Sequence, residues 1–266
     1  PSAAPLAVMR SSLLGSLVQV LKYNLARKAS RVRAFEIGRV AMRDASVVAS
    51  DTTVAGVHQP MRVAGLAQGP VDSTQWGSKE RSVDFFDVKG DVEALLSPQR
   101  VSFEAAEHPA LHPGRCARVL ADGQAIGYVG ELHPRWRQAY ELPASPVLFE
   151  LSLDAVLARQ VPVPQAIAKH QGAWRDLALV VPEAASHDAL MRSLQADPAG
   201  LVREATWFDV YKPTVPSGDM RPGERSLAVR LELLDPQATL TEERIDDTVA
   251  NAVARATQSV GARLRG

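Results

Sequence analysis

An acidic cluster at residues 84–93 holds the side chains best suited to acid–base chemistry or metal binding. Asp84 and Asp87 stand on either side of a short strand pattern, whereas Asp91 and Glu93 begin a helical pattern. Acidic side chains in the first turn of a helix interact favourably with the helix dipole, which gives the second pair a structural role. We therefore predict no catalytic or metal-binding use for this cluster.

His108 and His112 are four residues apart, the spacing at which two metal ligands share one face of a helix. Pro109 and Pro113 would interrupt such a helix, so the favoured interpretation is a structured loop near a subunit contact. Cys116 lies in an alternating strand pattern and is expected in the core. No set of nucleophile, base and orienting group emerges, which argues against a stand-alone hydrolase or transferase.

The composition is that of a globular protein. The chain has 266 residues, of which 46% are hydrophobic and 23% are charged, and no stretch approaches the roughly 18–20 apolar residues of a membrane helix. A single cysteine excludes internal disulfides and fits a reducing compartment.

The chain begins with Pro1 and not with Met, which suggests a fragment of a longer chain or a processed N-terminus. The net charge is zero, but residues 10–43 are strongly basic and the remainder is acidic.

The first part of the chain predicts a mainly antiparallel α+β module. Asp122-Gly123 separates two alternating runs and predicts a hairpin, because glycine tolerates the positive φ of a tight turn. Alternating prolines in Val161–Gln165 favour an extended linker, and we expect a domain boundary near residue 168. Apolar periodicity predicts helices over 13–25 and around 92–96, and strands over 33–38, 61–66, 116–120, 125–129 and 147–151.

The last hundred residues predict the order β-α-β-β-α-β, which is the ferredoxin-like arrangement. Ser186 and Thr241 are each placed to cap a helix with an apolar stripe. Strands are expected over 177–181, 201–211, 225–234 and 262–265, and the loop before the third strand contains Pro213, Pro216, Gly218, Pro222 and Gly223.

Both helices of this fold cover one face of the sheet and leave the other face open. Strict alternation along the second and third strands predicts which side chains lie on the open face. The predicted set is Trp207, Asp209, Tyr211, Ser226 and Arg230, with Lys212, Arg221 and Arg225 from the adjoining loop.

Aromatic rings, a carboxylate, a hydroxyl and several cations on one surface could stack unpaired bases, hydrogen-bond base edges and hold phosphates. Residues 203–230 are only weakly basic, so binding by charge alone is not expected. Two alternatives remain open at this point. The aromatic rings could pack against a neighbouring domain, or the domain could be a small-molecule module that senses amino acids, since fold alone does not decide function.

Four groups of short motifs run along the chain: Met9–Leu14 with Asn24–Arg27 and Phe35–Gly38; Phe85–Glu93; Glu107–Arg115 with Gly130–Pro134; and Arg175–Val181 with Phe208–Tyr211, Arg225–Leu227 and Thr239–Thr241. In this order they resemble the C-terminal part of the bacterial phenylalanyl-tRNA synthetase β subunit. Each motif is short, but the series covers essentially the whole chain.

The resemblance implies two domains. Residues 1–165 are similar to the later part of the family's class-II-synthetase-like module, which is non-catalytic in the β subunit. Residues 168–266 are similar to its ferredoxin-fold anticodon-binding domain. The implied function is tRNA(Phe) anticodon recognition and subunit assembly within phenylalanine–tRNA ligase. The resemblance also implies that this chain has no catalytic residue, metal site or cofactor of its own. In the family, ATP and magnesium are bound elsewhere in the enzyme.

By the same resemblance, Tyr211 stacks on an anticodon base while Asp209 and Ser226 hydrogen-bond base edges. The implied RNA-binding set is completed by three neighbouring cations, Arg230, Lys212 and Arg225. The implied partners are tRNA(Phe) and the α subunit, in a cytoplasmic heterotetramer of two α and two β subunits with no membrane contact. The basic residues 10–43 are most simply a solvated face, with contact to tRNA phosphates or to a subunit as alternatives.

Overall fold

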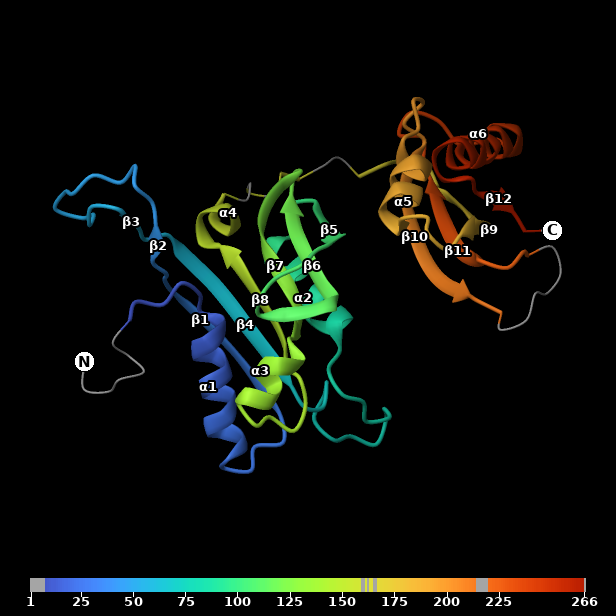
Figure 1. Cartoon of the computed structure of the whole chain (residues 1–266). Coiled ribbons are helices and arrows are strands. Elements are labelled where there is room, and N and C mark those ends of the chain that lie inside the picture. The colour runs from blue at the N-terminus through green and yellow to red at the C-terminus, as the bar shows by residue number, and fades with distance from the viewer. Residues whose placement is uncertain (1–7, 159–160, 162, 165–166, 214–219, 266) are drawn as a thin grey trace. The chain divides into compact units, whose positions relative to one another are not determined.

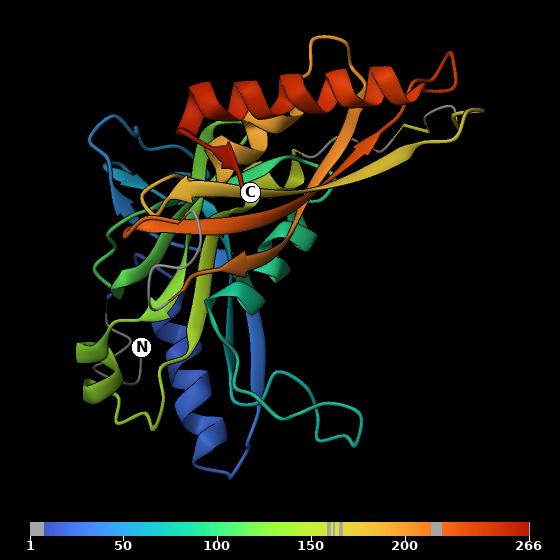
Figure 2. The ribbon, with the colours of Figure 1, turned by 90° about the vertical axis from the view of Figure 1, so that its right-hand side faces the viewer.

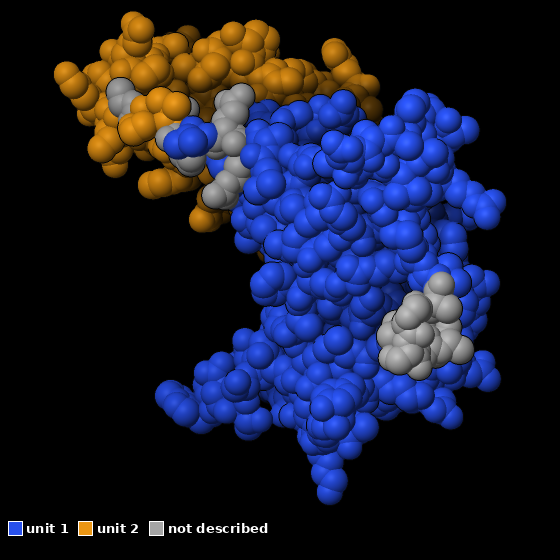
Figure 3. Space-filling view, turned by 90° about the vertical axis from the view of Figure 1, so that its left-hand side faces the viewer, with its two compact units in different colours: residues 1–162 blue, residues 163–266 orange. Residues whose placement is uncertain are grey.

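The chain forms two compact units, residues 1–162 and 163–266 (Figures 1 and 3). The computed structural model describes residues 8–158, 161, 163–164, 167–213 and 220–265. Pro162 and Gln165 of the predicted linker therefore lie outside the described residues, as do Pro216 and Gly218 of the predicted loop. Within the described ranges, no helix is both long enough and apolar enough to cross a membrane.

Unit 1 contains an antiparallel sheet of six strands in the order β1-β4-β8-β7-β6-β5, and β2 and β3 form a separate pair. The strands are β1 (Val32–Arg39), β2 (Met42–Arg43), β3 (Val57–His58), β4 (Met61–Gln68), β5 (Val101–Ala105), β6 (Leu111–Ala121), β7 (Gln124–Leu132) and β8 (Val147–Ser152). The predicted hairpin is confirmed, because β6 and β7 are joined at Asp122 and Gly123, with φ angles of 49° and 81°.

Helices cover both faces of this sheet (Figure 1). The apolar stripe of α1 (Leu14–Leu25) packs on one face, together with Tyr140 at the end of α3 (Pro134–Ala139). The helices α2 (Phe85–Leu96) and α4 (Leu153–Leu157) pack on the other face. Cys116 is buried in the α1 cluster, which confirms its predicted place in the core.

The start of α2 corrects one prediction. Asp84 and Asp87 do not flank a strand, because Asp84 is the N-cap of α2. Its carboxylate accepts hydrogen bonds from the backbone N–H groups of Phe86 (2.8 Å) and Asp87 (3.2 Å), and the Asp87 carboxylate accepts from the Asp84 N–H (2.9 Å). This reciprocal capping satisfies backbone donors that the first turn leaves unpaired. Part of the acidic cluster is therefore the start of a helix.

Unit 2 has the predicted β-α-β-β-α-β order, and its sheet has the strand order β10-β11-β9-β12. Both helices lie on the same face, with α6 running along the sheet (Figure 2). The apolar residues between helices and sheet form one core. The elements are β9 (Ala173–Pro182), α5 (His187–Gln195), β10 (Val202–Tyr211), β11 (Glu224–Leu233), α6 (Glu242–Val260) and β12 (Arg263–Leu264), so the ferredoxin-like prediction is confirmed.

Gly127 provides a test of packing in unit 1. A Cβ atom at Gly127 would lie 2.0 Å from the Glu150 carbonyl oxygen of β8, whereas a Cβ atom at Gly90 in α2 would meet nothing within 4 Å. We expect Gly127→Ala to lower the free energy of unfolding by about 1–3 kcal/mol or more. Gly90→Ala is the matched control and should raise that free energy by about 0.5–1 kcal/mol. Urea denaturation of both variants measures the difference, and equal midpoints would contradict the close approach of β7 and β8.

Asp87 provides a pH test. Two hydrogen bonds from the Arg81 guanidinium (2.7 and 2.6 Å) are the main cause that lowers the pKa of Asp87 from 3.8 to about 2. Because the pKa in the folded state lies below the unfolded value, the stabilisation is present above pH 4 and is lost as the pH falls towards 2. Arg81→Gln should therefore destabilise unit 1 at pH 7, and by less at pH 2, where Asp87 is partly protonated in the folded state and largely protonated in the unfolded state. Equal losses in urea denaturation at both pH values would rule out this linkage.

Candidate nucleic-acid interface

The pairing of β10 with β11 determines which side chains lie on the open face of unit 2. The ladder has two one-residue irregularities, between Val202 and Glu204 and between Trp207 and Asp209. Residues directly opposite each other share a face. Asp209 lies opposite Ala228 and Tyr211 opposite Ser226, and all four are on the face away from the helices. The predicted placement of Asp209 and Tyr211 is therefore confirmed.

Trp207 does not lie on the open face, so this part of the prediction is wrong. It pairs with the buried Val229, and its ring packs on His187 of α5 with 5.0 Å between ring centroids. Its indole N–H donates a hydrogen bond to the Asp209 carbonyl oxygen (2.8 Å). The extra residue in the ladder is Phe208, which reverses the alternation at this point.

The ring of Tyr211 is 40% exposed and is partly covered by Arg265, whose guanidinium lies 4.7 Å from the ring centroid. Arg265 follows β12, and its backbone N–H donates to the Ala178 carbonyl oxygen on β9 (2.8 Å). Ala178 and Ala228 are cross-strand neighbours, so only small side chains separate Arg265 from β10 on this face. A guanidinium that packs on an aromatic ring presents a second flat surface for stacking.

The two polar residues near Tyr211 differ in accessibility. The Asp209 carboxylate is exposed and has no hydrogen-bond or ion-pair partner among the described residues. Ser226 is only 4% exposed, and its neighbours across the ladder, Tyr211 and Val180, are both larger. The open face therefore presents the carboxylate but not the serine hydroxyl.

The predicted cations are engaged within the protein. Arg230 donates two hydrogen bonds of 2.7 Å to Asp176, which raise the pKa of Arg230 and lower that of Asp176. Its guanidinium lies 5.6 Å from the Phe208 ring, which places this ring beside the open face. Lys212 pairs with Glu183 and lowers the pKa of that carboxyl.

Arg225 corrects a further prediction. It is the second residue of β11 and not part of a loop, and it lies opposite Val181, on the face that the helices cover. Its guanidinium donates a hydrogen bond to the Ala185 carbonyl oxygen (2.8 Å). Arg225 therefore holds the turn before α5 and does not extend the open face.

Trp174 belongs to the open face and was missed by the sequence analysis. It lies opposite Glu232 in the ladder between β9 and β11 and is 60% exposed. The predicted strand began at Leu177, whereas β9 begins at Ala173. Extending the alternation of Asp176, Ala178 and Val180 back by one step would have found it.

The two histidines bind neighbouring backbone groups. The Nδ1 atom of His108 accepts from the Ala110 N–H (3.2 Å), and that of His112 accepts from the Gly114 N–H (3.0 Å). His108 precedes β6, but His112 lies within it, so the predicted loop is only partly correct. In the part of the chain that the structure describes, no three His, Cys, Asp or Glu side chains gather in a group that could hold a metal ion.

A four-stranded ferredoxin-like sheet with exposed aromatic rings on its open face is typical of modules that bind single-stranded RNA. The family described as ferredoxin-fold anticodon binding domain matches residues 168–265. The family described as phenylalanyl tRNA synthetase beta chain CLM domain matches residues 1–153. The chain belongs to the phenylalanyl-tRNA synthetase beta chain family.

Sequence identity to individual relatives supports the same family assignment. The chain is 49% identical to the phenylalanine–tRNA ligase beta subunit of Cupriavidus pinatubonensis and 47% identical to that of Burkholderia pseudomallei, in both cases over 100% of this chain. It spans about a third of the length of these relatives, 33% and 34% respectively. A solved pyrrolysyl tRNA synthetase of Desulfitobacterium hafniense overlaps 56% of this chain and 47% of its own at 11% identity, with a TM-score of 0.38, too low to carry an argument.

Arg230 allows a direct test of the ion pair on the open face. We expect Arg230→Gln to return the pKa of Asp176 towards the ordinary value of 3.8, because the two hydrogen bonds that lower it are lost. Carboxyl carbon-13 shifts followed through an acid titration measure this change. Arg203→Gln, which removes a different ion pair to Glu232, is the control and should leave the Asp176 titration unchanged. An Asp176 titration that is the same with and without Arg230 would contradict the pairing.

Proposed function

We propose that unit 2 recognises the anticodon of tRNA(Phe) as part of phenylalanine–tRNA ligase. The observation that carries this proposal is the open face, where Tyr211 lies side by side with Asp209, whose carboxylate has no partner among the residues that the structure describes. Family membership supports the proposal, because the family that matches unit 2 is described as an anticodon binding domain.

Tyr211 stacks on an unpaired base, and Asp209 accepts hydrogen bonds from donors on a base edge. A carboxylate accepts and cannot donate, so it favours bases that present N–H groups. Arg265 already packs on Tyr211, and either stacks with the incoming base or turns to a phosphate. Phe208 and Trp174 extend the aromatic surface along the sheet. Ser226 reaches a base only if the side chains around it move, since its hydroxyl is buried.

Charge contributes little to this proposed recognition. Arg230 and Lys212 bind phosphates only by exchanging their carboxylate partners, Asp176 and Glu183. Each phosphate contact steepens the dependence of binding on salt, so few contacts give a shallow dependence. The main affinity of this module comes from stacking and hydrogen bonds.

The basic residues 10–43 are also largely engaged within unit 1. Arg10 pairs with Glu36, Lys22 with Glu141 and Arg33 with Asp91, while the guanidinium of Arg27 packs on the ring of Tyr23. These contacts favour a solvated structural face over a dedicated phosphate site.

The remaining features of the ligase are part of the same proposal. Unit 1 contributes to assembly with an α subunit in a heterotetramer of two α and two β subunits, in the cytoplasm. Phenylalanine activation, with its ATP and magnesium, takes place outside this chain. The support for these statements is family membership, together with relatives that are three times as long.

Replacing Tyr211 tests anticodon recognition. We expect Tyr211→Ala to weaken binding of tRNA(Phe) by about 1–3 kcal/mol, the typical contribution of one base–aromatic stack. The measurement is a titration of the chain with tRNA(Phe) and with a transcript in which the first anticodon base is changed, at one fixed salt concentration. Trp76→Ala is the control, because Trp76 is an exposed aromatic residue of unit 1 far from this sheet in sequence. Equal affinity for both RNAs, unchanged by Tyr211→Ala, would refute the recognition.

A further inference from the structure

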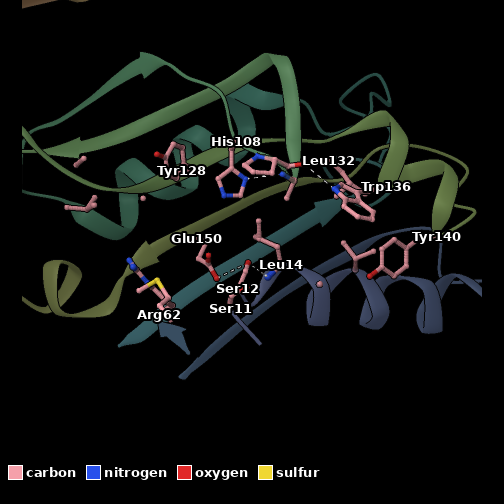
Figure 4. Close-up of a pocket in the computed structure, with 18 residues that line it drawn as sticks. Ser11, Ser12, Leu14, Arg62, His108, Tyr128, Leu132, Trp136, Tyr140 and Glu150 are labelled. Carbon is pink, nitrogen blue, oxygen red and sulfur yellow. Dashed lines mark hydrogen bonds between the residues drawn. The ribbon is translucent and has the colours of Figure 1, made fainter. Parts of the chain in front are cut away.

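Unit 1 contains a cavity of about 670 Å³ that anticodon recognition does not use. Its walls come from the first half of α1, from α3, and from the segment before β6, with β7 and β8 beneath them (Figure 4). We call it the α1 cavity. Its size is in the range of cavities that bind small organic molecules.

One end of the α1 cavity holds two opposite charges that do not pair with each other. Glu150 uses one carboxylate oxygen, Oε1, to accept from the Leu13 N–H (2.6 Å) and the Ser12 hydroxyl (3.3 Å) at the start of α1. No described residue donates a hydrogen bond to its other oxygen, Oε2. Arg62 is half-buried and forms no hydrogen bond or ion pair with any described residue.

The sheet register keeps these two charges close. Glu150 lies opposite Ala64, and Arg62 lies opposite Ser152, so they are diagonal neighbours on one face of the sheet. Diagonal neighbours in an antiparallel pair are typically about 7–8 Å apart. A small ligand with a cationic and an anionic end can therefore reach both groups at once.

The other end of the cavity is aromatic, and Trp136 is held there by its indole N–H, which donates to the Pro109 carbonyl oxygen (3.1 Å). Tyr140, directly after α3, lies beyond Trp136 at the same end of the cavity (Figure 4). The rings of His108 and Tyr128, 5.0 Å apart, lie nearer the charged end, because Tyr128 is opposite Glu150 in the ladder between β7 and β8. Burial is the main cause that lowers the pKa of His108, while the nearby Glu150 carboxylate acts in the opposite direction. The end at Trp136 and Tyr140 suits an apolar or aromatic body.

We propose that the α1 cavity binds a small zwitterion with an aromatic or apolar body, namely an amino acid or short peptide with both termini free. Its ammonium group donates to Glu150 Oε2, its carboxylate pairs with Arg62, and its body lies against Trp136 and Tyr140. A neutral ligand would desolvate both charges without pairing either, which is unfavourable. A simple anion would be repelled by Glu150 and a simple cation by Arg62.

The binding experiment uses the complete 266-residue chain, with thermal shift and calorimetric titration. The probes are L-tryptophan, L-phenylalanine and the dipeptide L-phenylalanyl-L-phenylalanine, each also tested with its amine acetylated or its carboxylate amidated. L-serine tests the need for an apolar body. A ligand that binds only the folded chain raises the unfolding midpoint. We expect an aromatic zwitterion to raise it, and either capped form to bind at least about tenfold more weakly, because each loses a charged hydrogen bond. Binding by the dipeptide but not by the single amino acids identifies a peptide site.

Two variants test the assigned contacts. Glu150→Gln keeps an oxygen for the Leu13 N–H and the Ser12 hydroxyl but loses the charge, and Arg62→Gln removes a side chain that has no partner among the described residues. We expect each to weaken binding at least about tenfold. Arg118→Gln is the matched control, because Arg118 lies opposite Tyr128 on the same sheet face but does not line the cavity.

Three results would overturn the proposal: no binding of any probe, capped analogues that bind as tightly as the free forms, or binding unchanged in Arg62→Gln. The last result is decisive even if Glu150→Gln unfolds. Because the α1 cavity lies in unit 1, these results are independent of whether Tyr211 binds RNA.

Discussion

Residues that lie opposite each other in a β-ladder must share a face of the sheet, and this constraint between β10 and β11 shapes the proposed RNA interface. Two one-residue irregularities interrupt the ladder, and each reverses the alternation. Their effects cancel at the end of β10, so Tyr211 and Asp209 lie on the open face. Between them the alternation is reversed, and Trp207 packs on α5 instead. Two aromatic residues four positions apart on one strand therefore lie on opposite faces of the sheet.

The same open face shows why a net charge of zero is compatible with the proposed RNA recognition. Arg230 on β11 is paired with Asp176 on the neighbouring strand β9, and Lys212, just after β10, is paired with Glu183, just after β9. Exposed ion pairs contribute little to stability, but they leave few cations free for phosphates. Aromatic rings remain, together with the Asp209 carboxylate, which has no partner among the described residues; in the proposed interface these groups would discriminate between bases more than they attract RNA. The structure thus favours selectivity over affinity in this module.

In unit 1, Glu150 links folding to the proposed binding site. One of its oxygens holds the start of α1, while its side chain also lines the cavity together with Arg62, which has no partner among the described residues. The close approach of β7 and β8 at Gly127 belongs to the same region, because any side chain there would meet the Glu150 backbone. A carboxylate that already has a structural role is fixed in position, and a fixed charge loses little entropy when a ligand arrives.

The sequence by itself determined the order of elements in unit 2, its ferredoxin-like arrangement and the family resemblance, because apolar periodicity, helix caps and short motifs are local properties of the chain. It also placed Tyr211 and Asp209 correctly, but only because two irregularities happened to cancel. The tertiary structure decided the face of Trp207 and Arg225, the packing of Arg265 on Tyr211, and the α1 cavity. Each of these depends on which residues of distant strands lie opposite each other. Strand register is set by the packing of the whole sheet, and no local pattern in the sequence encodes it.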